Sequence, residues 1–153
     1  MKKLFVIVAG LLLSTSLYAG VKEKKALRDL TSTIETLTNQ MKADCGNTEL
    51  KSVVVEETTF PANRINIAKR NAEDFFAGIS VVCKDEDYRE EIAKLTQLNF
   101  SLTDDGARNG NKTKIYGKIG LTDEKNMVVN LHVQYLMSNN TTDLLPKVIK
   151  ELY

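Results

Sequence analysis

The stretch that decides the fold is residues 127–137, MVVNLHVQYLM. Apolar and polar positions alternate along much of it, and a period of two is typical of a β-strand with one buried face. The odd-numbered residues are predicted to face the core, and they are Met127, Val129, Leu131, Val133, Tyr135 and Met137. The even-numbered residues are predicted to face away, and they are Val128, Asn130, His132, Gln134 and Leu136.

Two shorter strands are predicted just before this stretch, at residues 97–102 and 114–121. Strands joined by short loops pair antiparallel, so these two and residues 127–137 predict a three-strand meander. A fourth strand is expected at residues 50–58, where Val53, Val54 and Val55 form a β-branched centre.

Helices are predicted around these strands from apolar residues spaced three and four apart. Their ranges are 22–44, 62–83, 86–94 with Asp85 as N-cap, and a last helix that starts at Thr141 or Thr142 and runs to Leu152. The predicted fold class is α+β, in two layers: an antiparallel sheet of about four strands with helices packed on one face.

The N-terminus has the layout of a secretory signal peptide at residues 1–19. Lys2 and Lys3 precede an apolar run over residues 4–13, and small or mixed residues follow up to Ala19. The run is about half of the ~20 residues that a spanning helix needs, so no stable membrane anchor is expected. Cleavage is predicted after Ala19, with Gly20 as the alternative. Residues 20–153 then form a single α+β domain in the periplasm or outside a bacterial cell.

The charge balance argues against nucleic acid as a partner. The full chain has 21 Lys+Arg and 20 Asp+Glu. Loss of Lys2 and Lys3 leaves 19 basic and 20 acidic side chains, a formal net charge of −1. A near-neutral domain provides no overall attraction for a polyanion.

The two cysteines, Cys45 and Cys83, are predicted to form a disulfide, because an even pair in an oxidising compartment is usually bridged. Both stand at expected helix ends. A zinc site is not predicted, since there is no CxxC motif and the single histidine, His132, is distant in sequence. No metal ligands and no cofactor are expected.

The predicted outward face of the sheet is the candidate binding site. Its polar side chains on the last two strands are Lys114, Tyr116, Lys118, Asn130, His132 and Gln134, and Gln97, Asn99 and Ser101 continue the face on the strand before them. Tyr and His offer flat area with a hydrogen-bonding tip, so a protein, peptide or glycan is the expected partner. The alternative is a solvated face without a partner.

The sequence therefore predicts a small exported soluble domain that acts as a non-catalytic binding or inhibitor-type module. A carboxylate-dependent hydrolase is the first alternative, because acidic residues cluster at 85–91. Acids at a helix N-terminus also stabilise the helix itself. A structural protein that self-associates through its first helix is the second alternative.

Overall fold

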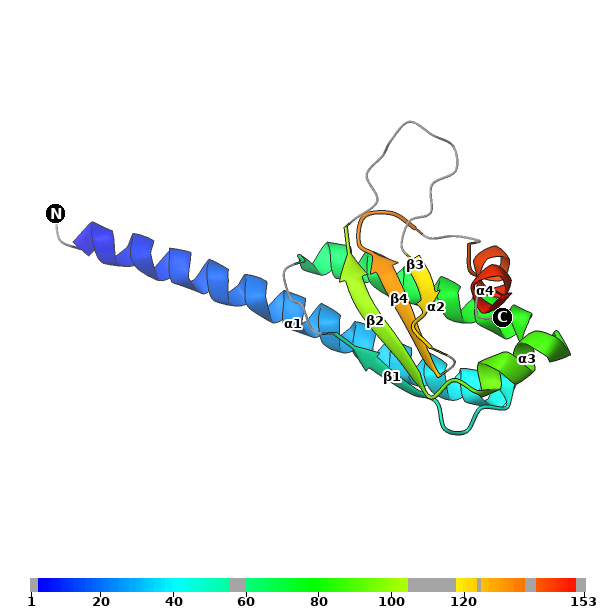
Figure 1. The fold of residues 1–153 in the computed structure, drawn as a ribbon. Helices are drawn as coiled ribbons and strands as arrows, with labels where there is room; N and C mark the ends of the chain where they lie inside the picture. The colour runs from blue at the N-terminus through cyan, green and yellow to red at the C-terminus, as the bar shows by residue number, and fades with distance from the viewer. Residues whose placement is uncertain (1–2, 56–59, 105–117, 124, 137–139, 151–153) are drawn as a thin grey trace, which may run out of the picture.

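The computed structural model describes residues 3–55, 60–104, 118–123, 125–136 and 140–150 (Figure 1). For residues 3–19, 118 and 140 the backbone alone is described. The order of elements is α1 (Lys3–Cys45), β1 (Lys51–Val54), α2 (Ala62–Val82), α3 (Glu86–Ala93), β2 (Gln97–Thr103), β3 (Lys118–Leu121), β4 (Asn126–His132) and α4 (Asn140–Lys150). The predicted α+β class is confirmed.

The predicted antiparallel meander is wrong, because the sheet is mixed. Its strand order is β1-β2-β4-β3. β1 and β4 both run parallel to β2, whereas β3 and β4 form an antiparallel pair. β4 therefore lies between β2 and β3 instead of at the end of a meander.

Connection lengths explain the mixed sheet. β3 and β4 are joined by the short segment 122–125, so they form a hairpin as predicted. The segment between β2 and β3, residues 104–117, is long enough for β3 to pair elsewhere, and β4 takes the place beside β2. The chain passes through α2 and α3 between β1 and β2, and such a crossover is what a parallel pair requires.

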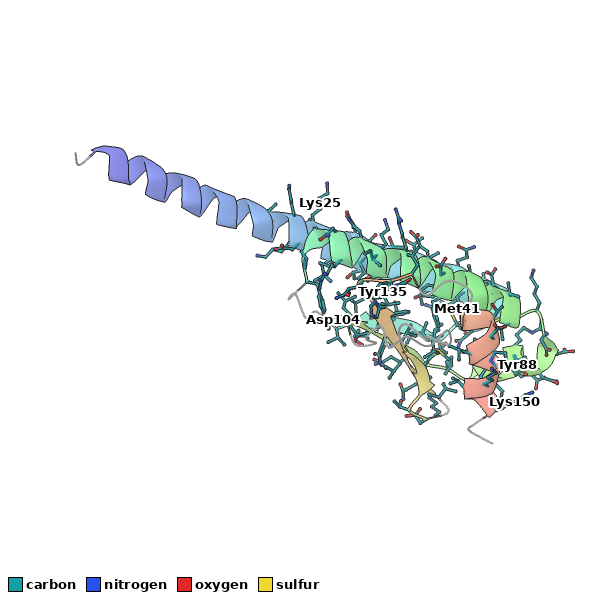
Figure 2. All side chains as sticks on the ribbon, turned by 90° about the horizontal axis from the view of Figure 1, so that it is seen from above. Lys25, Met41, Tyr88, Asp104, Tyr135 and Lys150 are labelled. Atoms are coloured by element: carbon teal, nitrogen blue, oxygen red, sulfur yellow. A yellow bond between two sulfur atoms is a disulfide. The ribbon has the colours of Figure 1, made fainter. Side chains whose placement is uncertain are left out.

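Helices α1 and α2 run side by side over one face of the sheet (Figures 1 and 2). Their apolar stripes meet the inward residues of the strands. Phe75 and Phe76 of α2 contact Phe100 of β2, each with a ring-centroid separation of 5.7 Å. The fully buried side chains include Leu30, Ile34 and Met41 from α1, Ile65, Phe75 and Ile79 from α2, and Leu98, Phe100, Met127 and Leu131 from the sheet.

The first part of α1 extends beyond the ends of the sheet and of α2 (Figure 1). The first residue of α1 in the described core is Ala26. Among the residues whose side chains are described, no helix is long and apolar enough to cross a membrane.

The predicted disulfide between Cys45 and Cys83 is confirmed. It joins the last residue of α1 to the C-cap of α2, with a Cα–Cα distance of 5.3 Å. Both cysteines are buried. The C-termini of the two helices are therefore held together, and α1 and α2 run in the same direction (Figure 1).

A buried amide fixes the turn that follows the disulfide. Gly46 adopts a φ of 68°, in the left-handed region that favours glycine at the end of a helix. Asn47 then donates from Nδ2 to the carbonyl oxygens of Ile92 (3.0 Å) and Leu95 (2.7 Å), and its Oδ1 accepts from the backbone N–H of Leu50 (3.0 Å). The end of α1 is thus tied to the turn between α3 and β2.

Helix α4 packs against α2 and β3, and it approaches α2 closely at Gly78. A Cβ atom at Gly78 would lie 2.5 Å from the Cβ of Thr141, which is too close for two carbon atoms. At the other end of α4, the Lys150 ammonium lies 5.9 Å from the ring centroid of Tyr88 in α3. Figure 2 labels both residues.

Loss of the disulfide is expected to destabilise the domain strongly. The bridge spans 38 residues, and closing a loop of that length lowers the entropy of the unfolded chain by an amount worth about 4 kcal/mol. We predict that the double variant Cys45→Ala/Cys83→Ala loses about this much unfolding free energy in urea. A loss of unfolding free energy below about 1 kcal/mol would show that the disulfide contributes little to the stability of the domain.

Candidate functional site

The open face of the sheet is the candidate site, because α1 and α2 lie on the opposite face and no described helix covers this one (Figures 1 and 2). Strand register places its side chains in rows. The middle row is Val53, Asn99, Val128 and Gly120, and the row beside it is Lys51, Gln97 and Asn126. Ser101, Asn130 and Lys118 form the third row.

The side chains described on this face carry mainly amide groups, a hydroxyl group and the apolar groups of valines. Gln97, Asn99, Ser101 and Asn130 on this face are half-buried. Ser101 Oγ donates to Asn130 Oδ1, and Gln97 Nε2 donates to Asn99 Oδ1. Among the described side chains of the three rows, Lys51 is the charged one. The described side chains of this face are therefore polar and mostly uncharged.

The structure brings only part of the predicted binding set onto this face. Asn130 lies on it as expected, and the backbone of Lys118 is paired with Asn130 in the register of β3 and β4. Lys114 and Tyr116 lie outside the described residues. Gln134 is exposed, but it follows β4 instead of belonging to it.

The expectation that His132 is exposed is wrong, because its residue exposure is 0%. Nδ1 of the ring accepts from the backbone N–H groups of Gln134 (3.1 Å) and Tyr135 (3.0 Å). The imidazole is tilted against the Tyr135 ring, with centroids 5.1 Å apart. His132 thus organises the turn after β4 and does not present its ring to a partner.

The same turn explains why the strand ends early. The alternation predicted a strand to Met137, whereas β4 ends at His132. Asn71, fully buried in α2, donates from Nδ2 to the carbonyl oxygens of His132 (2.7 Å) and Tyr135 (2.8 Å). A side chain 61 residues away in the sequence therefore binds the chain at the point where it leaves the sheet.

The acidic cluster at α3 has structural contacts. Asp85 caps the helix as predicted, since its side chain accepts from the backbone N–H of Asp87 (3.1 Å). Glu86 pairs with Arg89 at 3.4 Å, and Glu91 pairs with Lys94 at 2.7 Å. Within the described residues, no group of three or more His, Cys, Asp or Glu side chains could hold a metal ion.

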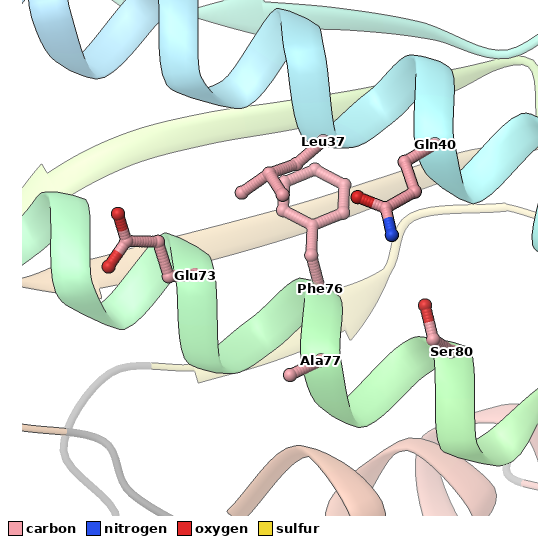
Figure 3. A pocket seen from close by; sticks show the side chains of 6 residues that line it. All are labelled: Leu37, Gln40, Glu73, Phe76, Ala77 and Ser80. Atoms are coloured by element: carbon pink, nitrogen blue, oxygen red, sulfur yellow. The ribbon is translucent and has the colours of Figure 1, made fainter.

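A surface pocket of about 160 Å³ lies between α1 and α2, on the helical side of the molecule (Figure 3). Its lining is Leu37, Gln40, Glu73, Phe76, Ala77 and Ser80. Glu73 is the only carboxylate among these six residues, so the lining does not offer the carboxylate pair that the hydrolase alternative requires.

The hairpin turn between β3 and β4 contains an ionisable group with a shifted pKa. Asn126 Nδ2 donates to the carboxylate of Asp123 (2.8 Å to Oδ2), and the backbone N–H of Lys125 donates to Oδ1 (2.7 Å). These hydrogen bonds favour the ionised form and hold the pKa of Asp123 below its usual value. The ionised Asp123 carboxylate therefore stabilises the folded state at neutral pH, and this stabilisation is lost as the pH falls through the lowered pKa of Asp123.

Comparison of the chain with family models, with curated proteins and with solved structures gives no match. The site is therefore described by its own geometry. Sequence alternation located the open face. The roles of Asn71 and His132 depend on contacts between distant segments.

We predict that Asn71→Asp costs about 3 kcal/mol or more of unfolding free energy, because a carboxylate would face two buried carbonyl oxygens that lose their donor. Asn66→Asp is the matched control: Asn66 is an exposed residue of the same helix, and its change should cost less than about 0.5 kcal/mol. Urea unfolding measures both. Equal costs would mean that Asn71 does not secure the end of β4.

Proposed function

We propose that the mature chain is an exported, non-catalytic binding module that acts in the periplasm or outside the cell. The observation that carries this proposal is the open sheet face, where amide and hydroxyl groups of β2 and β4 adjoin Val53 of β1 and Val55 just after it, each 44% exposed. Amide groups both donate and accept hydrogen bonds, so such a face suits an uncharged, hydrogen-bonding partner such as an extended peptide or a glycan.

The disulfide and the N-terminal segment support export. A buried bridge between Cys45 and Cys83 is typical of proteins that fold in an oxidising compartment. Residues 3–19 of the proposed signal peptide lie in the part of α1 that extends past the sheet (Figure 1). Cleavage after Ala19 would leave every described core residue in the mature chain, since the first of them is Ala26.

Export is tested by expressing the full chain in a bacterial host and measuring the intact mass of the product in the periplasm and medium. We expect a chain that begins at Gly20, or at Val21 if cleavage follows Gly20, with both cysteines oxidised. A product that keeps residues 1–19 and stays with the cell membrane would contradict export as a free domain.

Binding is tested with a photo-reactive amino acid placed at Asn99, in the middle of the open face. The same group at Asn66, on the exposed side of α2, is the matched control. We expect the Asn99 position to form adducts with one envelope protein or glycan and the Asn66 position to form none. Asn130→Arg should reduce the Asn99 adduct, because a long cation would occupy the adjoining row.

The same experiment can reject the proposed site. Adducts of equal yield from Asn99 and Asn66, or an Asn99 adduct that Asn130→Arg leaves unchanged, would place binding elsewhere. Adducts between two copies of the chain are distinguished by their mass and do not count as a partner.

A further inference from the structure

The charged side chains of α1 and α2 are separated along the length of the two helices. The helices pack side by side and the disulfide joins their C-termini, so residues equally far before the two cysteines lie at similar levels. The first halves, residues 21–32 and 62–70, carry seven basic and two acidic side chains. The second halves, residues 33–45 and 71–83, carry one basic and four acidic side chains. A chain that is nearly neutral as a whole therefore has positive charge at one end of its helical layer and negative charge at the other.

Four exposed cations and one half-buried cation form a surface that we call the basic end: Lys24, Lys25, Arg28, Arg70 and, half-buried, Lys69. On α1 the buried positions Ala26 and Leu30 face the core, so the cations of this helix point away from the sheet, as Figure 2 shows for Lys25. Within the described part of the chain, the ion pairs involve other side chains, such as Arg64 with Asp104 at 4.0 Å. The positive charge of the basic end is therefore available to an anionic partner.

The basic end is also where the apolar N-terminal segment joins the domain. α1 is one continuous helix from Lys3 to Cys45, so Lys24 and Lys25 follow residues 3–19 without a break. That part of α1 extends past the sheet and past α2 (Figure 1). While a signal peptide lies in the lipid, the helix positions directly after it lie at the phosphate headgroups. This step of the argument rests on the export that we propose above, and it makes the membrane the first anionic surface that the basic end meets.

We propose that the basic end of the mature chain binds the anionic surface of a lipid bilayer, through the phosphate groups of the lipid headgroups. Each Lys or Arg near such a surface is attracted by its negative potential and is worth about fivefold in affinity. Val21, which is 61% exposed at the start of the mature helix, adds an apolar contact with the lipid. The acidic second halves of the two helices are repelled by the same surface.

The separation of charge sets the orientation of the bound domain. α1 and α2 stand with their N-terminal ends towards the lipid and their disulfide-linked ends away from it. The open face of the sheet then lies to the side and stays accessible to its own partner. A bilayer is favoured over nucleic acid because it lines the compartment in which we propose that the domain acts. The binding module is thus held at the membrane without a spanning segment.

The test is co-sedimentation of the mature chain, residues 20–153, with lipid vesicles. This chain keeps every described core residue, and thermal melting checks that it folds. Vesicles of phosphatidylcholine and phosphatidylglycerol in equal parts provide the anionic surface, and vesicles of phosphatidylcholine alone are the neutral reference. We expect binding to the anionic vesicles only. Binding should be lost as the salt concentration rises from about 0.1 M to about 1 M, because the Debye length falls from about 10 Å to about 3 Å.

Charge variants locate the binding surface. Lys24→Gln/Lys25→Gln should weaken binding to the anionic vesicles by about tenfold or more, since two attractions are removed. Arg70→Gln, on the neighbouring helix, should weaken it by about fivefold. Lys24→Arg/Lys25→Arg keeps both charges and should bind like the wild type.

The matched control removes the same net charge at the far end of the domain. Lys84 directly follows the disulfide, and the carbonyl oxygen of Lys125 accepts from the backbone N–H of Thr96, just before β2. Both lysines are exposed. Lys84→Gln/Lys125→Gln should leave the affinity within about threefold of the wild type, because these charges lie beyond a Debye length from the lipid.

Absence of binding to the anionic vesicles overturns the proposal, and so does equal binding to the neutral vesicles. A control variant that loses as much affinity as Lys24→Gln/Lys25→Gln overturns it too, since net charge alone would then decide. Salt-dependent association of copies without vesicle binding, seen by ultracentrifugation, would assign the basic end to the acidic end of a second copy. If Lys24→Gln/Lys25→Gln fails to fold, Arg70→Gln replaces it. The mass of the exported product tests export separately, so failure of the two proposals is distinguishable.

Discussion

The Cys45–Cys83 disulfide is the constraint on which the arrangement of this domain depends. It joins the C-termini of α1 and α2, and because these helices pack side by side they run in the same direction. The chain that leaves α1 must then return along its length before α2 can begin, and β1 lies on that return path. Gly46 and Asn47 redirect the chain directly after the bridge. The positions of α1, β1 and α2 are thus linked by the disulfide and by the path of the chain, and the other strands pack beside them.

Two buried asparagines fix the ends of strands, which the apolar core alone does not specify. Asn47 ties the end of α1 to the turn between α3 and β2, and Asn71 ties α2 to the end of β4. Apolar contacts stabilise a fold without fixing its register, because they have little directional preference. An amide that donates to two backbone carbonyl oxygens is satisfied in one arrangement only, so these side chains fix where the strands begin and end.

The placement of α1 and α2 on one face leaves the other face of the sheet open to a partner (Figure 1). The described side chains of this face are mainly amide, hydroxyl and valine groups, and Val53 and Val55 are each 44% exposed. Of the carboxylates at α3, Asp85 caps the helix, and Glu86 and Glu91 form ion pairs. The composition of the open face supports the binding role that we propose.

The sequence by itself indicated roughly where the helices and strands lie, the disulfide and the polar character of the open face, although β4 ends at His132 and α1 begins at Lys3. Each of these follows from local periodicity or from the pairing of two cysteines. Tertiary structure decided the strand order, the parallel pairing of β2 with β4, and the burial of His132. Periodicity tells which residues share a face, but it does not tell which strand lies beside which. The position of His132 depends on Asn71 and on the turn to Tyr135, and a hydrogen bond between residues 61 apart has no signature in the local pattern.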